Sequence, residues 1–335
     1  MMTGGSATTE EKVILRIEDL HTSFFTPEGE VKAVNGVNLE LKENRILGIV
    51  GESGSGKSVT ALSIMRLVPQ PGKIVAGAIY FDDVNLLELG YERLRNIRGR
   101  DIAIIFQEAT TALNPIINIG THMEEVLLAH SKMTKAEARE RSLELLAEME
   151  LPSPPDILRR YPYELSGGQA QRVMIAMAMA WNPRVLIADE ITSNLDVTIQ
   201  ADVLNRLKRL RAERHSAIML ITHNMGVIAQ TAQDVAVMYA GAVVEYGDIL
   251  SVFRRPYHPY TWALLQTIPR LDDPQRVLQT IQGSSPSLID LPDQCPYMAR
   301  CPKATNECRL SPKPQLTEVE PGHYVACYNM IEHEE

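Results

Sequence analysis

Residues 51–58 read GESGSGKS, a full match to the phosphate-binding pattern G-x-x-x-x-G-K-[S/T]. Glycines let backbone N–H groups cradle phosphate oxygens, while the lysine reaches the outer phosphates and the final hydroxyl ligates Mg²⁺. The alternative is a chance glycine loop, which average residue frequencies give in about 1% of chains. The candidate nucleotide-binding residues of this stretch are Gly51, Ser53, Gly54, Ser55, Gly56, Lys57, Ser58 and Thr60.

The residues on both sides of this loop support the same prediction. Ile46–Val50 is a continuous apolar run that ends at Gly51, which is typical of a buried parallel strand. A helix is expected after the loop, through about Leu67, and its N-terminus faces the same anion. The loop alone leaves the class open, because kinases, GTPases, helicases and transporter motors all share it.

Further strands are predicted in both directions from the loop. Two apolar patterns separated by a TPEG turn, at 13–20 and 31–41, predict an antiparallel lobe. Four later runs, several of them separated by helical stretches, predict an α/β sheet with a largely parallel core. These runs are Ile102–Phe106, Arg184–Asp189, Ala217–Ile221 and Asp234–Tyr239.

A helical insertion is predicted between two sheet strands, at about 115–180. Its clearest member is the charged amphipathic segment Ala136–Leu151, accompanied by about Ile116–His130 and Gln169–Trp181. The proline-rich stretch LPSPPD at 151–156 divides it. From Phe253 the chain becomes rich in proline and turns. We therefore expect a nucleotide-binding domain over 13–254 and a small C-terminal domain over 255–335 with little regular structure.

Composition narrows the possible partners. The 335 residues are 45% hydrophobic and 22% charged, with a net charge of −9, which argues against a general nucleic-acid binder. The longest apolar run, Val173–Trp181, is far shorter than the roughly 20 residues of a membrane-spanning helix. The polar N-terminus does not resemble a secretory signal. We expect a cytoplasmic chain whose membrane role comes through a partner.

Residues 165–169 read LSGGQ just before a predicted helix, and this pentapeptide resembles the signature of the ABC ATPases. In that family these residues bind the γ-phosphate of ATP held by the opposite subunit. The resemblance gives this role to Ser166, Gly167, Gly168 and Gln169. A simple helix N-cap at Ser166 is the alternative, and the two are compatible because both use the same donors.

Other family elements follow in order. The strand VLIADE ends in two carboxylates, and the resemblance implies that Asp189 holds Mg²⁺ through water while Glu190 is the general base. Gln107 matches the glutamine that contacts Mg²⁺ and the water, and His223 the switch histidine that touches the γ-phosphate. An acidic pair in solvent is the alternative at 189–190. Taken alone, a glutamine after a strand would mean little.

Two further matches are weaker. Asp196, in SNLD, matches the loop that crosses the dimer interface in the family. Phe24 matches the aromatic residue that stacks on adenine. The neighbouring Phe25, or a core role for either ring, is an equal alternative.

Longer segments resemble the peptide/nickel importer subfamily of ABC transporters. They include FQEATTALNP, MYAGAVVEYGD and the tail RRPYHPYTWALL, and the likeness extends from about residue 13 to the end. It implies an ABC ATPase cassette, with a RecA-like parallel-sheet core, an antiparallel β lobe and a helical insertion. It also implies a related second ATPase subunit, two transmembrane permease subunits, an extracytoplasmic solute-binding protein and a position at the cytoplasmic face of the inner membrane. A di- or oligopeptide is the expected solute; nickel, glutathione-like, opine and sugar solutes stay open.

The chain departs from the family pattern at three positions. Ile191 replaces a proline after the catalytic glutamate, Asn224 replaces an aspartate after the switch histidine, and Ala109 replaces a common proline. None of these changes removes a catalytic group. They bear on the rate of hydrolysis more than on its existence.

The four cysteines form a separate candidate site. They lie only in the C-terminal region, at Cys295, Cys301, Cys308 and Cys327, with spacings of x5, x6 and x18. Thiolates in a reducing compartment are ligands for soft metals or iron–sulfur clusters, and the tight C-x₂-C of structural zinc sites is missing. The subfamily resemblance implies a [4Fe–4S] cluster. Zinc, and free thiols or disulfides, are the alternatives. A change at one cysteine is expected to loosen the tail and leave ATP binding nearly intact.

Two rival functions remain open from the sequence. One is an ABC ATPase of DNA repair or translation, which usually carries a long coiled-coil insert or two cassettes in one chain. The other is a regulatory cassette that binds ATP without hydrolysing it. The presence of both Glu190 and His223 argues against the second.

Overall fold

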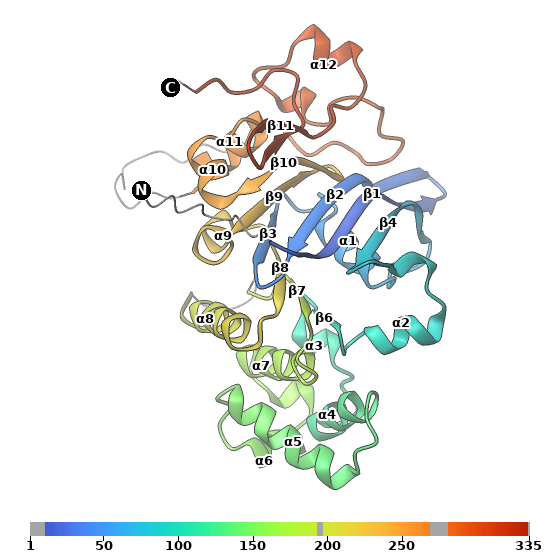
Figure 1. Ribbon diagram of the computed structural model, residues 1–335, viewed down its shortest axis with the longest axis vertical. Coiled ribbons are helices and arrows are strands. Elements are labelled where there is room, and N and C mark those ends of the chain that lie inside the picture. Colours follow the sequence, from blue (N-terminus) through green and yellow to red (C-terminus); the bar gives the residue numbers. More distant parts are fainter. Residues whose placement is uncertain (1–10, 193–196, 269–280, 334–335) are drawn as a thin grey trace, which may run out of the picture.

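The computed structural model describes residues 11–192, 197–268 and 281–333. Its main sheet has the strand order β11-β12-β10-β9-β3-β8-β7-β6, and the five strands from β9 to β6 are parallel. Figure 1 shows this sheet in the middle of the molecule. Its parallel strands are β3 (Ile46–Val50), β6 (Ile102–Ile105), β7 (Val185–Asp189), β8 (Ala217–Thr222) and β9 (Asp234–Tyr239). The parallel core predicted from the sequence is therefore confirmed.

The central strand β3 is buried on both faces. Ile46 and Val50 pack in one hydrophobic core, and Leu47 and Ile49 pack in a second core on the opposite face. Side chains alternate between the two faces of a strand, so a strand covered on both faces needs apolar residues at every position. This explains the unbroken apolar run before the glycine-rich loop.

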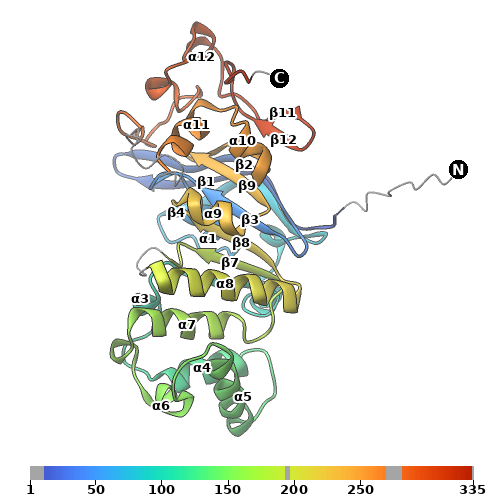
Figure 2. The same ribbon diagram turned by 90° about the vertical axis from the view of Figure 1, so that its left-hand side faces the viewer.

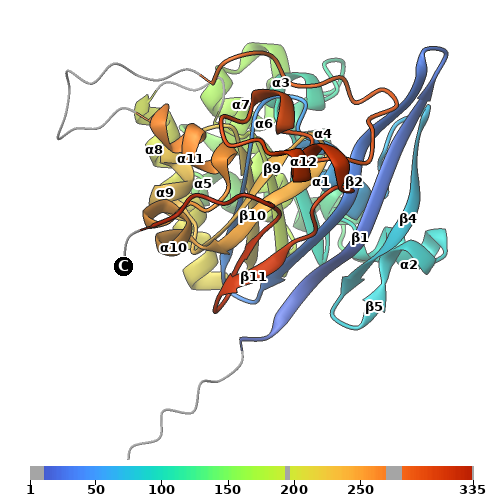
Figure 3. The same cartoon turned by 90° about the horizontal axis from the view of Figure 1, so that it is seen from above.

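A second sheet of order β2-β1-β4-β5 packs beside the first and lies at the right in Figure 3. Both long strands extend beyond the predicted ranges. The stretch 21–26 (HTSFFT) continues β1. It pairs with β2 on one side, and its residues up to Phe24 pair with β4 on the other. The strands are β1 (Val13–Thr26), β2 (Gly29–Lys42), β4 (Gly72–Phe81) and β5 (Val84–Asn85).

The helices of the predicted insertion are present within a few residues of their expected ends. Thr134 begins α5 with a capping box to Glu137. The helix ends before the proline-rich stretch 151–156, in which α6 begins. Figures 1 and 2 show α4, α5 and α6 at the end of the molecule opposite the C-terminal region. The helices of this half are α1 (Lys57–Ile64), α2 (Tyr91–Ile97), α3 (Ala109–Ala112), α4 (Ile119–Leu128), α5 (Lys135–Glu148), α6 (Pro154–Arg159) and α7 (Gly167–Ala178).

The C-terminal region contains more regular structure than predicted. Its strands join the main sheet, because β12 pairs with β10 in antiparallel fashion. The buried carboxylate of Glu245 on β10 holds the junction, accepting from Tyr257 N at 2.8 Å, His258 N at 2.9 Å and His323 Nε2 at 2.8 Å. The remaining elements are α8 (Val197–Arg214), α9 (Met225–Thr231), β10 (Ala242–Asp248), α10 (Ile249–Arg254), α11 (Pro259–Gln266), α12 (Asn306–Leu310), β11 (Thr317–Glu320) and β12 (His323–Val325).

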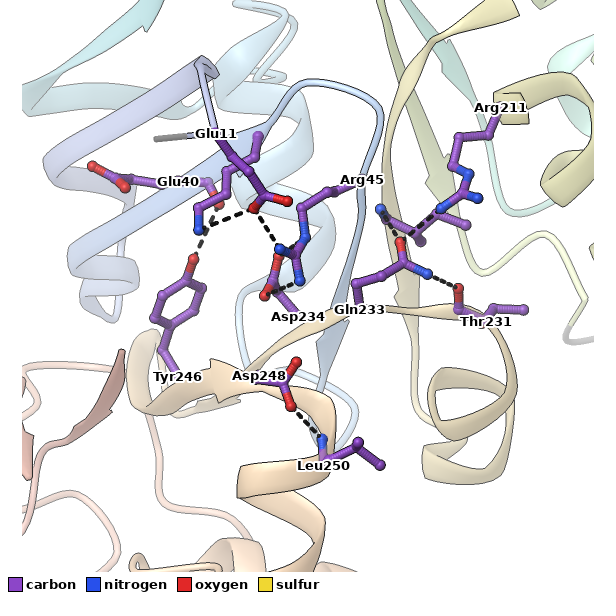
Figure 4. Close-up of polar contacts among 12 residues, drawn as sticks. Glu11, Glu40, Arg45, Arg211, Thr231, Gln233, Asp234, Tyr246, Asp248 and Leu250 are labelled. Atoms are coloured by element: carbon purple, nitrogen blue, oxygen red, sulfur yellow. Dashed lines mark hydrogen bonds and ion pairs between the residues drawn. The ribbon is translucent and has the colours of Figure 1, made fainter. Parts of the chain in front are cut away.

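Polar contacts tie together the amino ends of β3 and β9 (Figure 4). Arg45 binds the carboxylate of Asp234 through Nε at 2.9 Å and Nη2 at 3.0 Å. Beside this pair, Gln233 Oε1 accepts hydrogen bonds from Ile46 N at 2.9 Å and Arg211 Nη1 at 3.1 Å. These bonds fix the register between neighbouring strands, and so where their carboxyl ends emerge.

Candidate nucleotide site

The carboxyl ends of four neighbouring parallel strands meet at one edge of the main sheet. The glycine-rich loop follows β3, Gln107 lies just beyond β6, Asp189 and Glu190 end β7, and His223 follows β8. In open α/β sheets this edge is the usual ligand site. A cavity of about 660 Å³ lies there, lined by loop residues 53–58 together with Gln107, Glu190 and His223.

The loop conformation requires glycine at two of the predicted positions. Gly56 has a φ of 97°, and a Cβ there would lie 2.3 Å from the carbonyl oxygen of Ala33. A Cβ on Gly51 would lie 2.1 Å from the carbonyl oxygen of Met238. Close backbone approach thus excludes any side chain at either point.

Lys57 points back into the loop. Its Nζ donates to the carbonyl oxygens of Gly51 and Glu52, both at 2.9 Å, and to Ser55 Oγ at 3.3 Å. Burial lowers the pKa of Lys57, opposed by the nearby carboxylates of Glu190 and Asp189. A nucleotide phosphate bound here would supply the anionic partner that a buried ammonium needs.

Ser58 and Asp189 are brought together as the sequence predicted. Ser58 Oγ donates to Asp189 Oδ1 at 3.0 Å, and burial raises the pKa of Asp189. A hydroxyl and a carboxylate beside bound phosphates are the oxygen ligands that Mg²⁺ prefers, so these residues fit the ion. Thr60 lies behind the loop, where its Oγ1 donates to Gly56 O at 3.0 Å, and it is not among the cavity-lining residues.

The three predicted catalytic side chains converge. Glu190 Oε2 lies 3.1 Å from Gln107 Nε2 and 3.3 Å from His223 Nδ1. Glu190 has a φ of 47°, a left-handed conformation that is uncommon for residues other than glycine and often found at functional sites. A carboxylate held in this way at the cavity wall has the geometry of a general base for water.

The predicted signature residues lie on a separate surface. Ser166 is the N-cap of α7 and accepts from Gln169 N at 3.3 Å, and both Ser166 and Gly167 are exposed. Neither Gly168 nor any other signature residue lines the cavity. Within one chain, the signature and the loop therefore do not form a single site.

Of the two weaker sequence matches, Phe24 lies at the cavity and Asp196 is not described. Phe24 is half-buried and lines the cavity, whereas Phe25 is 48% exposed and does not. Asp196 lies outside the described residues. Sequence reasoning missed Leu288, which lines the cavity from the C-terminal region. It belongs to no motif, so its position follows from the fold alone.

The four cysteines are near one another but are not arranged as metal ligands. None forms a disulfide. Burial raises the pKa of the Cys327 thiol to about 12, with further contributions from Cys295, Cys301 and Cys308. Over residues 11–192, 197–268 and 281–333, no group of three or more His, Cys, Asp or Glu side chains is placed to hold a metal ion. The same described ranges contain no helix long and apolar enough to cross a membrane.

Two protein-family descriptions match the chain. Residues 34–193 match the description "ABC transporter", and residues 244–308 match "Oligopeptide/dipeptide transporter, C-terminal region". The oligopeptide transport ATP-binding protein OppD of Escherichia coli strain K12 is 43% identical over 326 residues, covering 97% of this chain and 96% of OppD. The dipeptide transport ATP-binding protein DppD of Bacillus subtilis strain 168 is 44% identical over 317 residues, or 94% of each chain.

A solved structure shares the nucleotide-binding part of the fold. It is the dimeric ATP-binding cassette MJ0796 in a post-hydrolysis state, bound to ADP and Pi. It matches with a TM-score of 0.64 and 30% sequence identity, covering 70% of this chain and 98% of the cassette.

Proposed function

Because this chain belongs to the family of ATP-binding subunits of oligopeptide and dipeptide ABC transporters, we propose that its hydrolysis of ATP powers the import of a di- or oligopeptide. The observation that carries this function is the contact of Gln107 and His223 with Glu190, in a cavity walled by the phosphate-binding loop. The relatives named for peptide transport match it over nearly their whole length. Nickel and other small solutes stay as alternatives.

The residues of the cavity have distinct roles in this proposal. Lys57 and the loop N–H groups bind the phosphates. Ser58 and Asp189 would hold Mg²⁺, which would supply positive charge to offset the charge that develops on the phosphate oxygens. Glu190 polarises the attacking water. Gln107 and His223 orient the Glu190 carboxylate. Phe24 stacks on the base.

A complete site takes two subunits in this proposal. The exposed Ser166 and Gly167 bind the γ-phosphate of ATP held by the loop of a second, related ATPase subunit. The dimeric state of the similar cassette MJ0796 supports this pairing. ATP then joins the subunits, and hydrolysis of the bond between its β- and γ-phosphates lets them separate. Binding energy that differs between open and closed states drives the motion.

The membrane partners follow from the same family. We propose that two permease subunits dock on the segment at about 108–121, at the cytoplasmic face of the inner membrane, and that a solute-binding protein delivers the solute from outside. Ile116 in this segment is 79% exposed, which suits a surface covered by a partner. The cassette over 13–254 would then transmit closure, while 255–335 forms the appended domain.

A [4Fe–4S] cluster at the four cysteines is proposed for the appended domain. The four cysteines are free thiols that lie near enough to affect the pKa of Cys327. Four such thiols are the donors that iron–sulfur clusters use. Binding would draw the four sulfurs from their present arrangement to a common centre. The group would have a structural role, because ATP hydrolysis needs no electron carrier. Zinc at the same residues is the alternative.

The hydrolytic role is tested by Glu190→Gln. This variant should bind ATP with nearly unchanged affinity, lose at least about a hundredfold in turnover and accumulate as an ATP-bound dimer. Hydrolysis and size-exclusion chromatography with and without Mg-ATP measure both effects. Wild-type turnover in the variant would show that Glu190 is not the base. A wild-type chain that binds ATP without turnover in its assembled transporter would instead favour a regulatory cassette.

The cluster is tested by metal content. Protein purified without oxygen should be brown, absorb broadly near 400 nm and contain about four irons per chain. Colourless protein with one zinc per chain would replace the cluster with a zinc site. Colourless protein without metal would rule out both.

A further inference from the structure

The C-terminal region reaches the phosphate-binding loop through one ion pair. Arg300 binds the carboxylate of Glu52 through two nitrogens, with 2.7 Å from Nη1 to Oε2 and 3.1 Å from Nη2 to Oε1. Ser285 Oγ donates to the same carboxylate at 2.6 Å. Glu52 is the second residue of the loop. Two distant parts of the chain therefore meet at the edge of the nucleotide cavity.

Arg300 is held in a fixed orientation. Its side chain is only 7% exposed, its Nε donates to Gln282 O at 2.9 Å, and its Nη1 donates to Tyr239 OH at 3.2 Å. A guanidinium that binds a carboxylate through two parallel bonds fixes the direction of that carboxylate as well as its distance. The pair can therefore orient the Glu52 side chain.

Glu52 connects the C-terminal region with the loop lysine through hydrogen bonds of its main chain. Its backbone N–H donates to Tyr260 OH on α11 at 2.9 Å, so the C-terminal region holds both its side chain and its main chain. Its carbonyl oxygen accepts the bond from Lys57 Nζ at 2.9 Å. One of the three residues that hold the lysine is thus itself held from outside the loop.

The same region forms part of the cavity wall. Ile289 makes an antiparallel bridge to Val31 on β2, and Lys32 N donates to Leu288 O at 3.1 Å. This pairing brings Leu288 to the cavity, on the same side as Phe24 and Val31. The C-terminal region therefore contacts the site both at Glu52 and along β2.

We propose that Arg300 is a positioning residue for ATP binding, which fixes Glu52 and thereby holds the loop and Lys57 in the conformation that receives the phosphates. The contact lies within one chain, so it acts whether or not a second subunit or a metal is bound. It also gives the C-terminal region an influence on ATP affinity. This differs from the expectation, drawn from the sequence, that loosening the tail leaves ATP binding nearly intact.

The test is ATP binding and hydrolysis by the full-length chain carrying Arg300→Gln. The Kd and KM for ATP should rise about tenfold, because the lysine and the loop N–H groups lose their preset geometry. The kcat should fall less than threefold, since Glu190, Gln107 and His223 are untouched. Arg300→Lys keeps the charge without the fork and should recover part of the lost affinity.

Two further variants separate positioning from general damage. Glu52→Gln alters the loop side of the pair, and the double variant with Arg300→Gln should be no weaker than the worse single one. Arg255→Gln breaks a 2.7 Å pair with Glu320 in the same region, away from the cavity, and should leave the KM unchanged. A KM within twofold of wild type in both Arg300→Gln and Glu52→Gln would overturn the proposal. So would losses that add fully in the double variant.

Discussion

Lys57 and Asp189 are only 4% and 6% exposed, yet both side chains are ionisable. Burial lowers the pKa of Lys57 and raises that of Asp189, so each charged form is disfavoured. Their partners are backbone carbonyls and the hydroxyls of Ser55 and Ser58. Burial of these two charges therefore costs stability, which Mg²⁺ and phosphate would offset in the proposed site.

Asp189→Asn should stabilise the nucleotide-free chain. Because the folded pKa of Asp189 is raised, its ionisation costs stability as pH rises through that pKa, and the cost is absent below the ordinary value near 3.9. An asparagine can still accept the bond from Ser58. We expect the Tm to rise by roughly 2–4 °C at pH 7 and not at the acid end, measured by calorimetry without nucleotide.

The same variant should lose the stabilisation that Mg-ATP gives to the wild type. Asn224→Ala is the matched control, because Asn224 also lies at this edge and its side chain accepts from Gly226 N at 2.9 Å. It removes a helix cap without removing a buried charge, so its Tm should fall. An equal or lower Tm for Asp189→Asn at pH 7 would show that the buried carboxylate carries no such cost.

Residue positions were predictable where a motif fixes them. Gln107, Glu190 and His223 each follow a strand, and parallel strands end at one edge, so their meeting follows from the pattern. The contact between Glu52 and Arg300 has no such signal. Its partners lie in unrelated segments, and only the packing of the C-terminal region brings them together.

Among elements, the apolar strands of the parallel core and the helices of the insertion were predicted, whereas β4 and the two short C-terminal strands were missed. The strand β12 has three residues and β11 has four, too few to show alternation. Pro259 in RRPYHPY indicated a turn, but it is the first residue of α11, where a missing N–H has no cost. The capping side chain there is His258, which lies outside the usual set of cap residues.

Arg45→Ala should destabilise the sheet at the amino ends of β3 and β9. It leaves the carboxylate of Asp234, 8% exposed, without the guanidinium that donates a hydrogen bond to it from Nη2 and forms an ion pair with it through Nε. Breaking such a pair costs about 3 kcal/mol. Arg255→Ala breaks the pair with Glu320, in which the arginine side chain is 52% exposed. It should lower the free energy of unfolding by less than about 1 kcal/mol. Urea unfolding compares the two, and equal losses would mean that burial of the Arg45 pair adds nothing.

Across the whole molecule, the loop and the signature are two separate parts of the proposed site. The loop lines the cavity, whereas Ser166 lies exposed at the start of α7. The family resemblance already assigns the signature to ATP held by the opposite subunit, whereas the order of the two motifs along the chain does not by itself separate them. The extension of the main sheet by β11 and β12 was also beyond the sequence patterns, since it depends on the buried Glu245.

Lys57→Ala and Ser166→Ala should therefore differ in the isolated chain. Lys57→Ala removes a charge from the chain's own loop and should weaken ATP binding by about tenfold or more. Ser166→Ala should leave ATP binding by the single subunit within about twofold of wild type. In the assembled transporter it should lower ATP turnover, because in the proposed dimer Ser166 donates to the ATP of the second subunit. Equilibrium ATP titration and steady-state hydrolysis measure the two properties separately.

Thr134→Ala separates this role from helix capping. Thr134 begins α5 as Ser166 begins α7: each hydroxyl accepts from the N–H three residues on at 3.3 Å, and each is half of a capping box. Losing either cap costs about 1 kcal/mol of stability, so both alanine variants should unfold slightly earlier. Only Ser166→Ala should also lose turnover in the complex. If Thr134→Ala loses as much, the effect comes from capping; if Ser166→Ala weakens ATP binding in the isolated chain as much as Lys57→Ala, the signature acts within its own chain.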